Sequence, residues 1–274
     1  MTNKKALLMV HFGTTHNDTR ELTIDKINKK FSDEFKDYDL FNAYTSRMVL
    51  KRLKDRGEIF DTPLKALEKM VEAGYDELIV QASHIIPGIE YENLLKEVNS
   101  FSENFKSIKI GKPLLYNLED YQKSVETLAE EYVPKNKKEA LVLVCHGTDS
   151  PLGASYAMLE YIFDAYDHEN VYVVATKAYP LMDTLIKKLK KDGIEAVRLA
   201  PFMFVSGEHA KKDMGIDYKN ELEENGIKVN EVIFKGLGEF EGIQEIFLQH
   251  LKNAIAKDDE DIAVFKKKYS DKYL

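Results

Sequence analysis

Residues 140–149 are ALVLVCHGTD and residues 6–15 are ALLMVHFGTT, and the two segments match position for position through an apolar run that ends in glycine. A short apolar run that stops at a turn residue is typical of a strand buried on both faces of a sheet. The later copy ends on His146, whereas the earlier copy has Phe12 at that position. The two segments therefore predict two related strands that bring different residues to their carboxyl ends.

The repetition extends beyond these two segments. Residues 40–47 (LFNAYTSR) resemble 171–178 (VYVVATKA), and residues 80–90 (VQASHIIPGIE) resemble 199–209 (LAPFMFVSGEH). Each of these matches is weak alone, but both occur in the same order after their copy of the first strand. This order indicates a duplicated α/β unit. The polar stretch VPKNKKE at 133–139 precedes the second copy, so we expect an N-terminal half at 1–133 and a C-terminal half at 134–274 that ends in a helix.

Helical patterns alternate with the apolar runs. Residues 62–74 begin with Thr62 as an N-cap and Pro63 in the first turn and stop at Gly74, and residues 181–193 also end in glycine. The predicted strands are 6–12, 40–45, 77–83, 108–115, 140–146, 171–179, 196–204 and 229–237. Alternation of strands and helices is typical of parallel sheets with crossover helices. The predicted fold class is α/β, with two similar Rossmann-like halves, each a parallel four-stranded sheet flanked by helices, and a cleft between them.

Open α/β sheets bind ligands beyond the carboxyl ends of their strands. The residues that the repeat places there are Phe12, Ser46, Glu90, His146, Lys177 and His209. Two histidines from one half that converge on a cleft are typical ligands of a divalent metal. The alternative, that both are ordinary loop-end histidines, stays open on the residues alone. Cys145 and His146 are neighbours on a strand, so their side chains are expected on opposite faces and do not form a catalytic pair.

The remaining histidines are expected to have other roles. His11 lies inside the first strand and is expected to be a hydrogen-bonded core residue. His16 and His84 are within reach of the cleft, with a structural role favoured for His84. His168 and His250 are expected on solvated helix or loop surfaces.

Composition excludes several classes of function. The chain carries 47 acidic and 39 basic residues, a net charge of −8, without a basic cluster, which argues against nucleic acid as a partner. Its single cysteine cannot form an intramolecular disulfide. The N-terminal apolar run is too short for a signal peptide, and no run approaches the length of a membrane span. We therefore expect a cytoplasmic protein without membrane partners.

Six motifs stand out along the chain, namely KALLMVHFGTTHNDT (5–19), DTPLKALEKM (61–70), SHIIPGIEYE (83–92), CHGTDSP (145–151), PFMFVSGEHAKKDM (201–214) and GLGE (236–239). Together they resemble the anaerobic cobaltochelatases of the CbiK family. The resemblance implies a class II chelatase, a lyase with a fold similar to that of ferrochelatase. It also implies insertion of Co(II), as the substrate metal, into the tetrapyrrole sirohydrochlorin or its precorrin-2 relative during cobalamin biosynthesis. No organic cofactor is expected, and a homo-oligomer is left open.

The resemblance also assigns roles to individual residues. The family's HG histidine corresponds to His146 and the histidine of its G-[DE]-H-A motif to His209, which makes both metal ligands and catalytic residues. The glutamate of its V-E-x-Y-P motif corresponds to Lys177, in TKAYP at 176–180, and this is a departure from the family pattern. An ammonium neither ligates a cation nor accepts a proton. Lys177 is instead expected to bind a substrate carboxylate.

Three further residues are expected to line the substrate site, namely Glu90, Thr14 and Phe12. Glu90 corresponds to His209 in the internal repeat and is a candidate for the missing carboxylate. Two alternatives to the chelatase hypothesis remain. One is a tetrapyrrole- or haem-binding protein of the same fold without insertion activity, and the other is unrelated metal chemistry such as hydrolysis.

Overall fold

The computed structural model describes residues 3–207 and 210–256, and within them the strands form two four-stranded parallel sheets. The first sheet has the order β2-β1-β3-β4 and the second has the order β6-β5-β7-β8. The strands are Lys5–His11 (β1), Asp39–Tyr44 (β2), Glu77–Ala82 (β3), Ser107–Ile110 (β4), Glu139–Cys145 (β5), Val171–Ala175 (β6), Ala196–Pro201 (β7) and Lys228–Val232 (β8). Each predicted strand is present, and the identical order confirms the predicted fold class of two related α/β halves.

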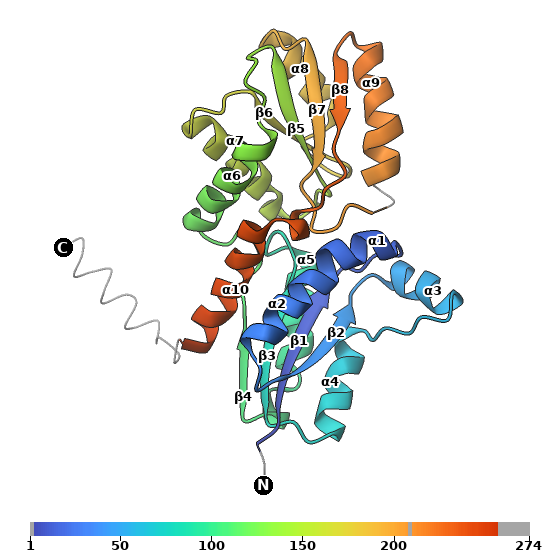
Figure 1. Ribbon diagram of the computed structural model, residues 1–274, viewed down its shortest axis with the longest axis vertical. Helices are drawn as coiled ribbons and strands as arrows, with labels where there is room; N and C mark the ends of the chain where they lie inside the picture. The colour runs from blue at the N-terminus through green and yellow to red at the C-terminus, as the bar shows by residue number, and fades with distance from the viewer. Residues whose placement is uncertain (1–2, 208–209, 257–274) are drawn as a thin grey trace, which may run out of the picture.

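The helices surround both sheets (Figure 1). They are Asn17–Arg20 (α1), Lys26–Glu34 (α2), Arg47–Asp55 (α3), Pro63–Glu72 (α4), Ile89–Asn99 (α5), Leu118–Tyr132 (α6), Ala154–Ala165 (α7), Met182–Lys191 (α8), Lys219–Glu224 (α9) and Glu241–Ala256 (α10). The predicted cap of α4 is present, because the Thr62 side chain accepts a hydrogen bond from the Lys65 backbone N–H at 3.2 Å. The described residues also contain two π-helical segments, Glu21–Asp25 and Ala210–Tyr218, and three short 3-10 helices, Ser102–Asn104, Pro151–Gly153 and Leu237–Glu239.

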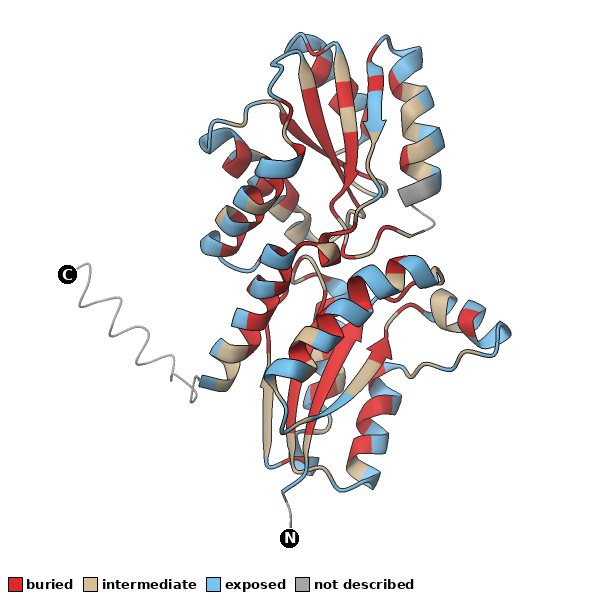
Figure 2. Ribbon diagram, viewed as in Figure 1, coloured by how far each residue is buried: buried red, intermediate tan, exposed pale blue. Residues whose placement is uncertain are grey.

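The central strands are buried because helices cover both faces of each sheet. Leu7 of β1 pairs in register with Leu40 on one side and with Ile79 on the other. Alternate side chains of each central strand enter two separate apolar clusters, and Figure 2 shows both strands as almost continuously buried. A strand buried on both faces needs an unbroken apolar run, which explains the sequences of β1 and β5.

The strands of the two halves point toward each other. In Figure 1 the arrows of β1 and β2 point up to the middle of the molecule, and those of β5, β7 and β8 point down to it. The carboxyl ends of both sheets, where α/β proteins bind ligands, therefore meet at the junction of the halves. The division of the chain at residues 133 and 134 remains a prediction, and the strands of the two sheets fall on either side of it.

Two helices connect the halves more closely than the sequence suggests. The C-terminal helix α10 packs on β3 and β4 of the first sheet and on α6, which in turn contacts α7. His250 of α10 is buried here, with Nε2 at 2.8 Å from Asp120 Oδ1 and Nδ1 at 3.1 Å from the Lys112 carbonyl oxygen. The expectation that His250 is solvated is therefore wrong, because its helix returns to cover the first sheet.

Candidate active site

The end of β5 separates two neighbouring side chains. The Cys145 side chain enters the core, where its thiol donates a hydrogen bond to the Val174 carbonyl at 3.3 Å, and burial raises its pKa to about 12. His146 is half-buried and lines the cleft between the halves. The strand therefore presents the imidazole to the cleft and keeps the thiol protonated and inert.

Gly147 permits a close approach that holds His146 in place. Its φ of +80° lies in the left-handed region, and a Cβ at this position would overlap the carbonyl oxygen of Lys177. The His146 carbonyl accepts two hydrogen bonds, from the Lys177 backbone N–H at 3.1 Å and from the Thr176 hydroxyl at 3.0 Å. The residue in the family's glutamate position is thus tied to the backbone of the cleft histidine.

The cleft has a volume of about 740 Å³, and both halves contribute to its wall. All the predicted site residues that the structure describes line it, namely Phe12, Thr14, Glu90, His146 and Lys177. Ser46, which the repeat placed at a strand end, and His16 line it as well. The structure brings these residues together, while their chemical roles remain predictions. The predicted ligand His209 lies outside the described residues.

The first half supplies an aromatic wall beside His146. Phe12 is 41% exposed, and its ring centroid lies 6.3 Å from that of His146. Thr14 is buried, and its hydroxyl accepts a hydrogen bond from the His16 backbone N–H at 3.2 Å. An apolar ring beside an imidazole can pack against one face of a flat ligand, and it has no lone pair with which to bind a cation.

His11 is a hydrogen-bonded core histidine, as the sequence predicts. Its Nδ1 accepts from the Ser83 hydroxyl at 2.9 Å, and its Nε2 donates to Asn28 Oδ1 at 2.9 Å. Burial lowers its pKa to about 4, against a smaller opposing effect of the Asn28 hydrogen bond. The ring therefore stays neutral in the folded protein above that pH and supports the cleft wall from within.

His84 follows β3 and lies in the same wall, but it differs from His11. Both of its ring nitrogens are shielded from solvent and have no hydrogen-bond partner among the described residues. Burial lowers the pKa of His84 to about 4, and the nearby carboxylate of Glu90 acts in the opposite direction. Sequence reasoning placed His84 within reach of the cleft but favoured a structural role, because the absence of a partner is visible only in the packed structure.

Several other residues of the cleft have no distinguishing signal in the sequence. Tyr156 of α7 is buried, and burial raises the pKa of its phenol, whereas Tyr218 donates to the Ala175 carbonyl at 3.1 Å. The charged residues of the lining, apart from Glu90 and Lys177, are Arg52, Lys212, Asp213 and Asp217. Arg52 lies on α3 and the other three lie on the π-helical segment Ala210–Tyr218, and nothing in their local sequence indicates that they share a cavity.

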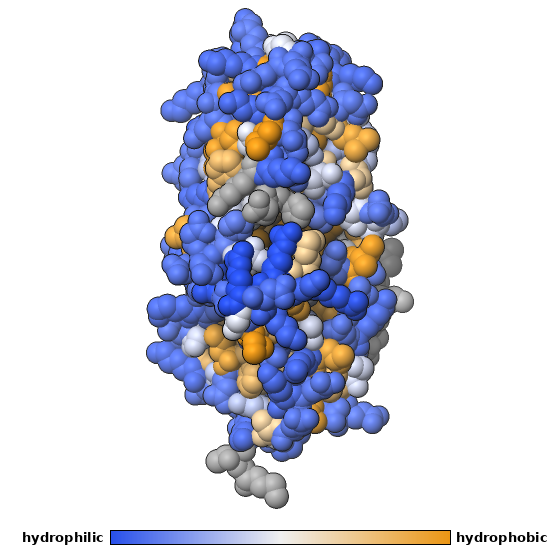
Figure 3. Space-filling view, turned by 90° about the vertical axis from the view of Figure 1, so that its right-hand side faces the viewer, coloured by the Kyte–Doolittle hydropathy of each residue, from blue (hydrophilic) through white to orange (hydrophobic). Residues whose placement is uncertain are grey.

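The charges of the cleft differ from those of the whole chain. Its lining holds three cationic and three acidic side chains, so it lacks the acidic excess of the full sequence. Figure 3 shows the face on which α3 projects in Figure 1, and strongly hydrophilic side chains gather midway along it. The basic residues of α3 are Arg47, Lys51, Arg52 and Lys54. Of these, Arg52 lines the cleft, where its guanidinium would attract an anionic group of a ligand.

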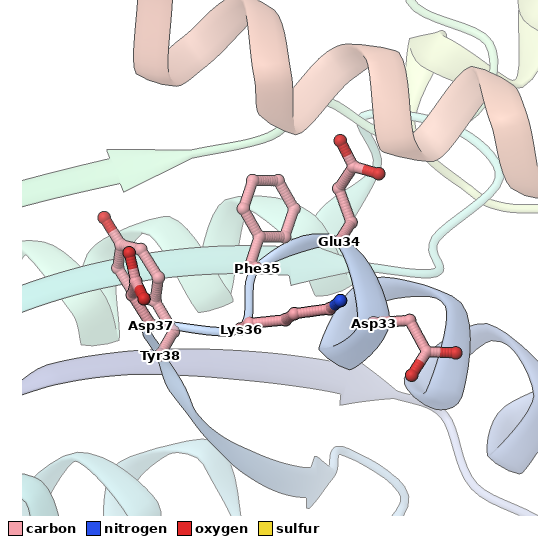
Figure 4. A pocket seen from close by; sticks show the side chains of 6 residues that line it. All are labelled: Asp33, Glu34, Phe35, Lys36, Asp37 and Tyr38. Carbon is pink, nitrogen blue, oxygen red and sulfur yellow. The ribbon is translucent and has the colours of Figure 1, made fainter.

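A second hollow, of about 380 Å³, is unrelated to the strand ends. Figure 4 shows the six consecutive residues that line it, 33–38, at the end of α2 and on the turn that follows. Glu34 pairs with Lys252 of α10 at 2.6 Å, and Asp33 pairs with Lys29 at 2.6 Å. This hollow is a surface feature where α2 meets α10, and it offers no histidine or cysteine for metal chemistry.

Within the described part of the chain, no group of three or more histidine, cysteine, aspartate or glutamate side chains is arranged to hold a metal ion. Among the same residues no helix is long and apolar enough to cross a membrane. The cleft thus has one histidine, His146, at the sequence-predicted metal position, with the second predicted ligand outside the described residues.

The fold consists of two parallel sheets, each covered by helices on both faces, that meet at their carboxyl ends, and a histidine lines the cleft between them. This arrangement is that of a two-lobed α/β protein of the chelatase class. The family described as cobalt chelatase (CbiK) matches residues 5–256. Sirohydrochlorin cobaltochelatase of Salmonella typhimurium is 36% identical over 95% of this chain and the whole of that protein. Sirohydrochlorin cobaltochelatase CbiKC of Nitratidesulfovibrio vulgaris is 32% identical over 94% of this chain and 93% of that protein.

The structural comparison agrees with the sequence comparisons on the fold. The sirohydrochlorin chelatase SirB from Bacillus subtilis subspecies spizizenii, solved in complex with cobalt, superposes with a TM-score of 0.65 at 11% identity, over 94% of this chain and 98% of that one. This chain belongs to the cobalt chelatase (CbiK) family.

Proposed function

We propose that this protein inserts Co(II) into sirohydrochlorin or its precorrin-2 relative, as a step of anaerobic cobalamin biosynthesis. The observation that carries the proposal is His146 at the end of β5, held in a cleft made by both halves of a CbiK-family chain. The names of the two cobaltochelatase relatives, each aligned over nearly its full length, support the same reaction.

The reaction exchanges two pyrrole protons for one divalent cation at the centre of the macrocycle. A neutral imidazole nitrogen holds such a cation or accepts a proton. We assign both tasks to His146 and His209, because one ring cannot use the same lone pair for both at once. Phe12 packs against the macrocycle in this proposal, and Thr14 donates a hydrogen bond to one of its carboxylates.

Lys177 and Glu90 have different roles in this proposal. Lys177 is exposed at the cleft and has no ion-pair partner among the described residues, so its ammonium is available to a substrate carboxylate. Glu90 is exposed in the same cleft and is our candidate for the carboxylate that Lys177 replaces.

An insertion assay tests the proposal. Purified full-length protein is mixed with sirohydrochlorin and Co(II) without oxygen, and the absorbance change is compared with that of the uncatalysed mixture. We expect a clear acceleration. A rate equal to the uncatalysed one would refute the chelatase function for this chain.

The Lys177 position has a direct test in the same assay. Because the side chain is exposed, Lys177→Ala is expected to raise the KM for sirohydrochlorin by about fivefold, the value of one exposed ion pair, with kcat retained. An unchanged KM would exclude the carboxylate-binding role.

Lys177 is also the observation that favours a second candidate function, tetrapyrrole or haem binding without insertion. If Lys177→Glu strongly accelerates insertion, the natural protein is a poor chelatase. A haem titration then checks the second candidate, which requires a shifted Soret band that His146→Ala abolishes.

A further inference from the structure

Arg52 is a cation of the cleft that the proposed function does not use. It lies on α3, its side chain is exposed, and within residues 3–207 and 210–256 no ion pair or hydrogen bond involves its guanidinium. The next arginine along the chain differs, because Arg56 Nη1 donates to the Thr15 carbonyl at 2.7 Å. The guanidinium of Arg52 is therefore available to a ligand in the cleft.

Hydrogen bonds join both ends of α3 to the loop that follows β1. At the start of the helix, the Ser46 backbone N–H donates to the Phe12 carbonyl at 3.2 Å. The Ser46 hydroxyl then accepts from the Val49 backbone N–H at 3.3 Å and caps the helix. At the other end, Arg56 holds the Thr15 carbonyl. The helix is thus positioned beside the cleft before a ligand arrives, which lowers the entropy cost of binding through its side chains.

One face of α3 is turned to the cleft. Met48, Val49 and Arg52 line the cavity, and their spacing places them on the same side of a helix. A Cβ on Gly13 would lie 3.1 Å from Val49 Cγ1, so the helix packs directly over the end of β1. Met48 is 55% exposed, and Phe12 is exposed beside the same cavity. This wall therefore combines exposed apolar side chains with a guanidinium.

That combination indicates which chemistry the wall recognises. A guanidinium binds a carboxylate through two parallel hydrogen bonds. A small inorganic anion would pair with Arg52 and leave Met48 and Phe12 in water. A flat apolar ring with carboxylates at its rim would bury both apolar side chains and pair with the cation as well. Lys177, which the second half contributes, lines the same cleft.

We propose that Arg52 is a specificity-determining residue that pairs with a substrate carboxylate on the edge of the macrocycle facing the first half. Lys177 pairs with another carboxylate on the edge facing the second half. This inference rests on the proposed function, in which Lys177 already binds a carboxylate. The ligand class is a tetrapyrrole with carboxylates around its whole rim, because a ring with carboxylates on one edge can pair with only one of the two cations at a time.

Binding of metal-free porphyrins tests the pairing without requiring insertion. Uroporphyrin carries carboxylates on every pyrrole ring, whereas deuteroporphyrin carries them on neighbouring rings at one edge. The fluorescence of each porphyrin is titrated with full-length protein. Arg52→Met keeps a long side chain and removes its charge, and it is expected to raise the Kd for uroporphyrin by about fivefold. The Kd for deuteroporphyrin should rise by about twofold at most, because this ligand can turn its carboxylates to Lys177.

Combining Arg52→Met with Lys177→Met sharpens the test. If the two cations act at separate edges, their losses multiply for uroporphyrin, and its Kd rises by about 25-fold. The double variant also removes the remaining cation from deuteroporphyrin, whose Kd then rises by about fivefold. Equal effects of Arg52→Met on the two porphyrins would overturn the assignment of Arg52 to a separate edge.

Lys54→Met is the matched control for charge. Lys54 lies on the same helix but on its opposite face, and it does not line the cleft. Its loss should leave the Kd for uroporphyrin near that of the wild type. Arg52→Lys keeps the charge at the site and should weaken binding less than Arg52→Met does. If Arg52→Met binds uroporphyrin as tightly as Lys54→Met, Arg52 anchors no carboxylate.

Insertion kinetics separate this inference from the proposed function. If both hold, Arg52→Met raises the KM for sirohydrochlorin by about fivefold and retains kcat. If only the binding role holds, uroporphyrin binding depends on Arg52, but neither the wild type nor any variant inserts cobalt. If only the insertion function holds, Arg52→Met inserts cobalt with the wild-type KM.

Discussion

The ends of β1 and β5 are equivalent places in two copies of one fold, and they carry different chemistry. Each strand is central in its sheet and runs into a glycine of positive φ, Gly13 at +91° and Gly147 at +80°. In the first half the histidine is one residue earlier, so His11 enters the core while Phe12 faces the cleft. In the second half Cys145 takes the core and the imidazole of His146 faces the cleft.

The comparison teaches that the register of a histidine on its strand decides its role. Successive side chains of a strand alternate between opposite faces. A shift of one residue therefore turns a potential ligand into a hydrogen-bonded core residue. The duplicated fold provides two equivalent cleft positions and equips only the second with an imidazole.

The largest effect is expected when the carboxyl end of β5 is made to resemble that of β1. His146→Phe removes the imidazole and keeps a ring in its place. We expect cobalt insertion to fall by about a thousandfold, within the range typical for loss of a residue that moves protons at a reacting centre. The insertion assay measures this loss, and a variant with near wild-type turnover would show that the difference between Phe12 and His146 has no functional meaning.

Gly13 and Gly147 are expected to differ in how much stability the protein loses when a methyl group is added at each. Gly147→Ala places a Cβ against the Lys177 backbone, whereas in Gly13→Ala the Cβ meets the Tyr44 ring, with Cδ2 at 2.6 Å. Both variants bear about 1–3 kcal/mol for the left-handed backbone, and Gly147→Ala is expected to lose more because backbone cannot move aside as a side chain can. Urea unfolding of both variants gives the order, and a larger loss for Gly13→Ala would contradict it.

Because His11 is buried, we expect the free energy of unfolding to fall in mild acid. Its pKa is about 4 in the folded protein and near its ordinary value of 6.5 in the unfolded chain, so the unfolded chain binds more protons between these values. The contribution of neutral His11 to the free energy of unfolding is complete above pH 6.5. It is lost as the pH falls toward 4, and the loss amounts to at most about 3 kcal/mol.

The variant His11→Asn removes this titration and should flatten the dependence of the unfolding free energy on pH from 4 to 6.5. Part of the slope should remain, because the pKa of His84 is also about 4. Denaturant titrations at several pH values, with His168→Asn as the control, measure the difference. Equal slopes for His11→Asn and the wild type would contradict the assignment.

The smallest expected effect is at the core counterpart of His11. Cys145→Ala removes a buried sulfur with one hydrogen bond and should destabilise the fold by about 1 kcal/mol, with insertion unchanged. The wild-type thiol should react with iodoacetamide only after unfolding, because its pKa is about 12. Rapid labelling of the native protein would show that the strand end is more open than this burial implies.

Sequence reasoning succeeded where a local pattern carries the information. The apolar runs predicted every strand of the two sheets, and the repeat predicted that His146, Lys177 and Glu90 share one cleft. It failed for His250, which is polar and on a helix and so has the local pattern of a solvated residue. Only the path of α10 across the first sheet places His250 against Asp120.

The sequence by itself determined the two α/β halves, the strand ends and the family, because these follow from side-chain periodicity and from motifs read along the chain. The tertiary structure alone decided which polar groups find partners. His11 and His84 are both histidines at the end of an apolar strand, yet the first is fully paired and the second is not. Hydrogen bonding of a buried side chain depends on atoms that are distant in sequence, such as Asn28 beside His11, and no spacing along the chain reveals them.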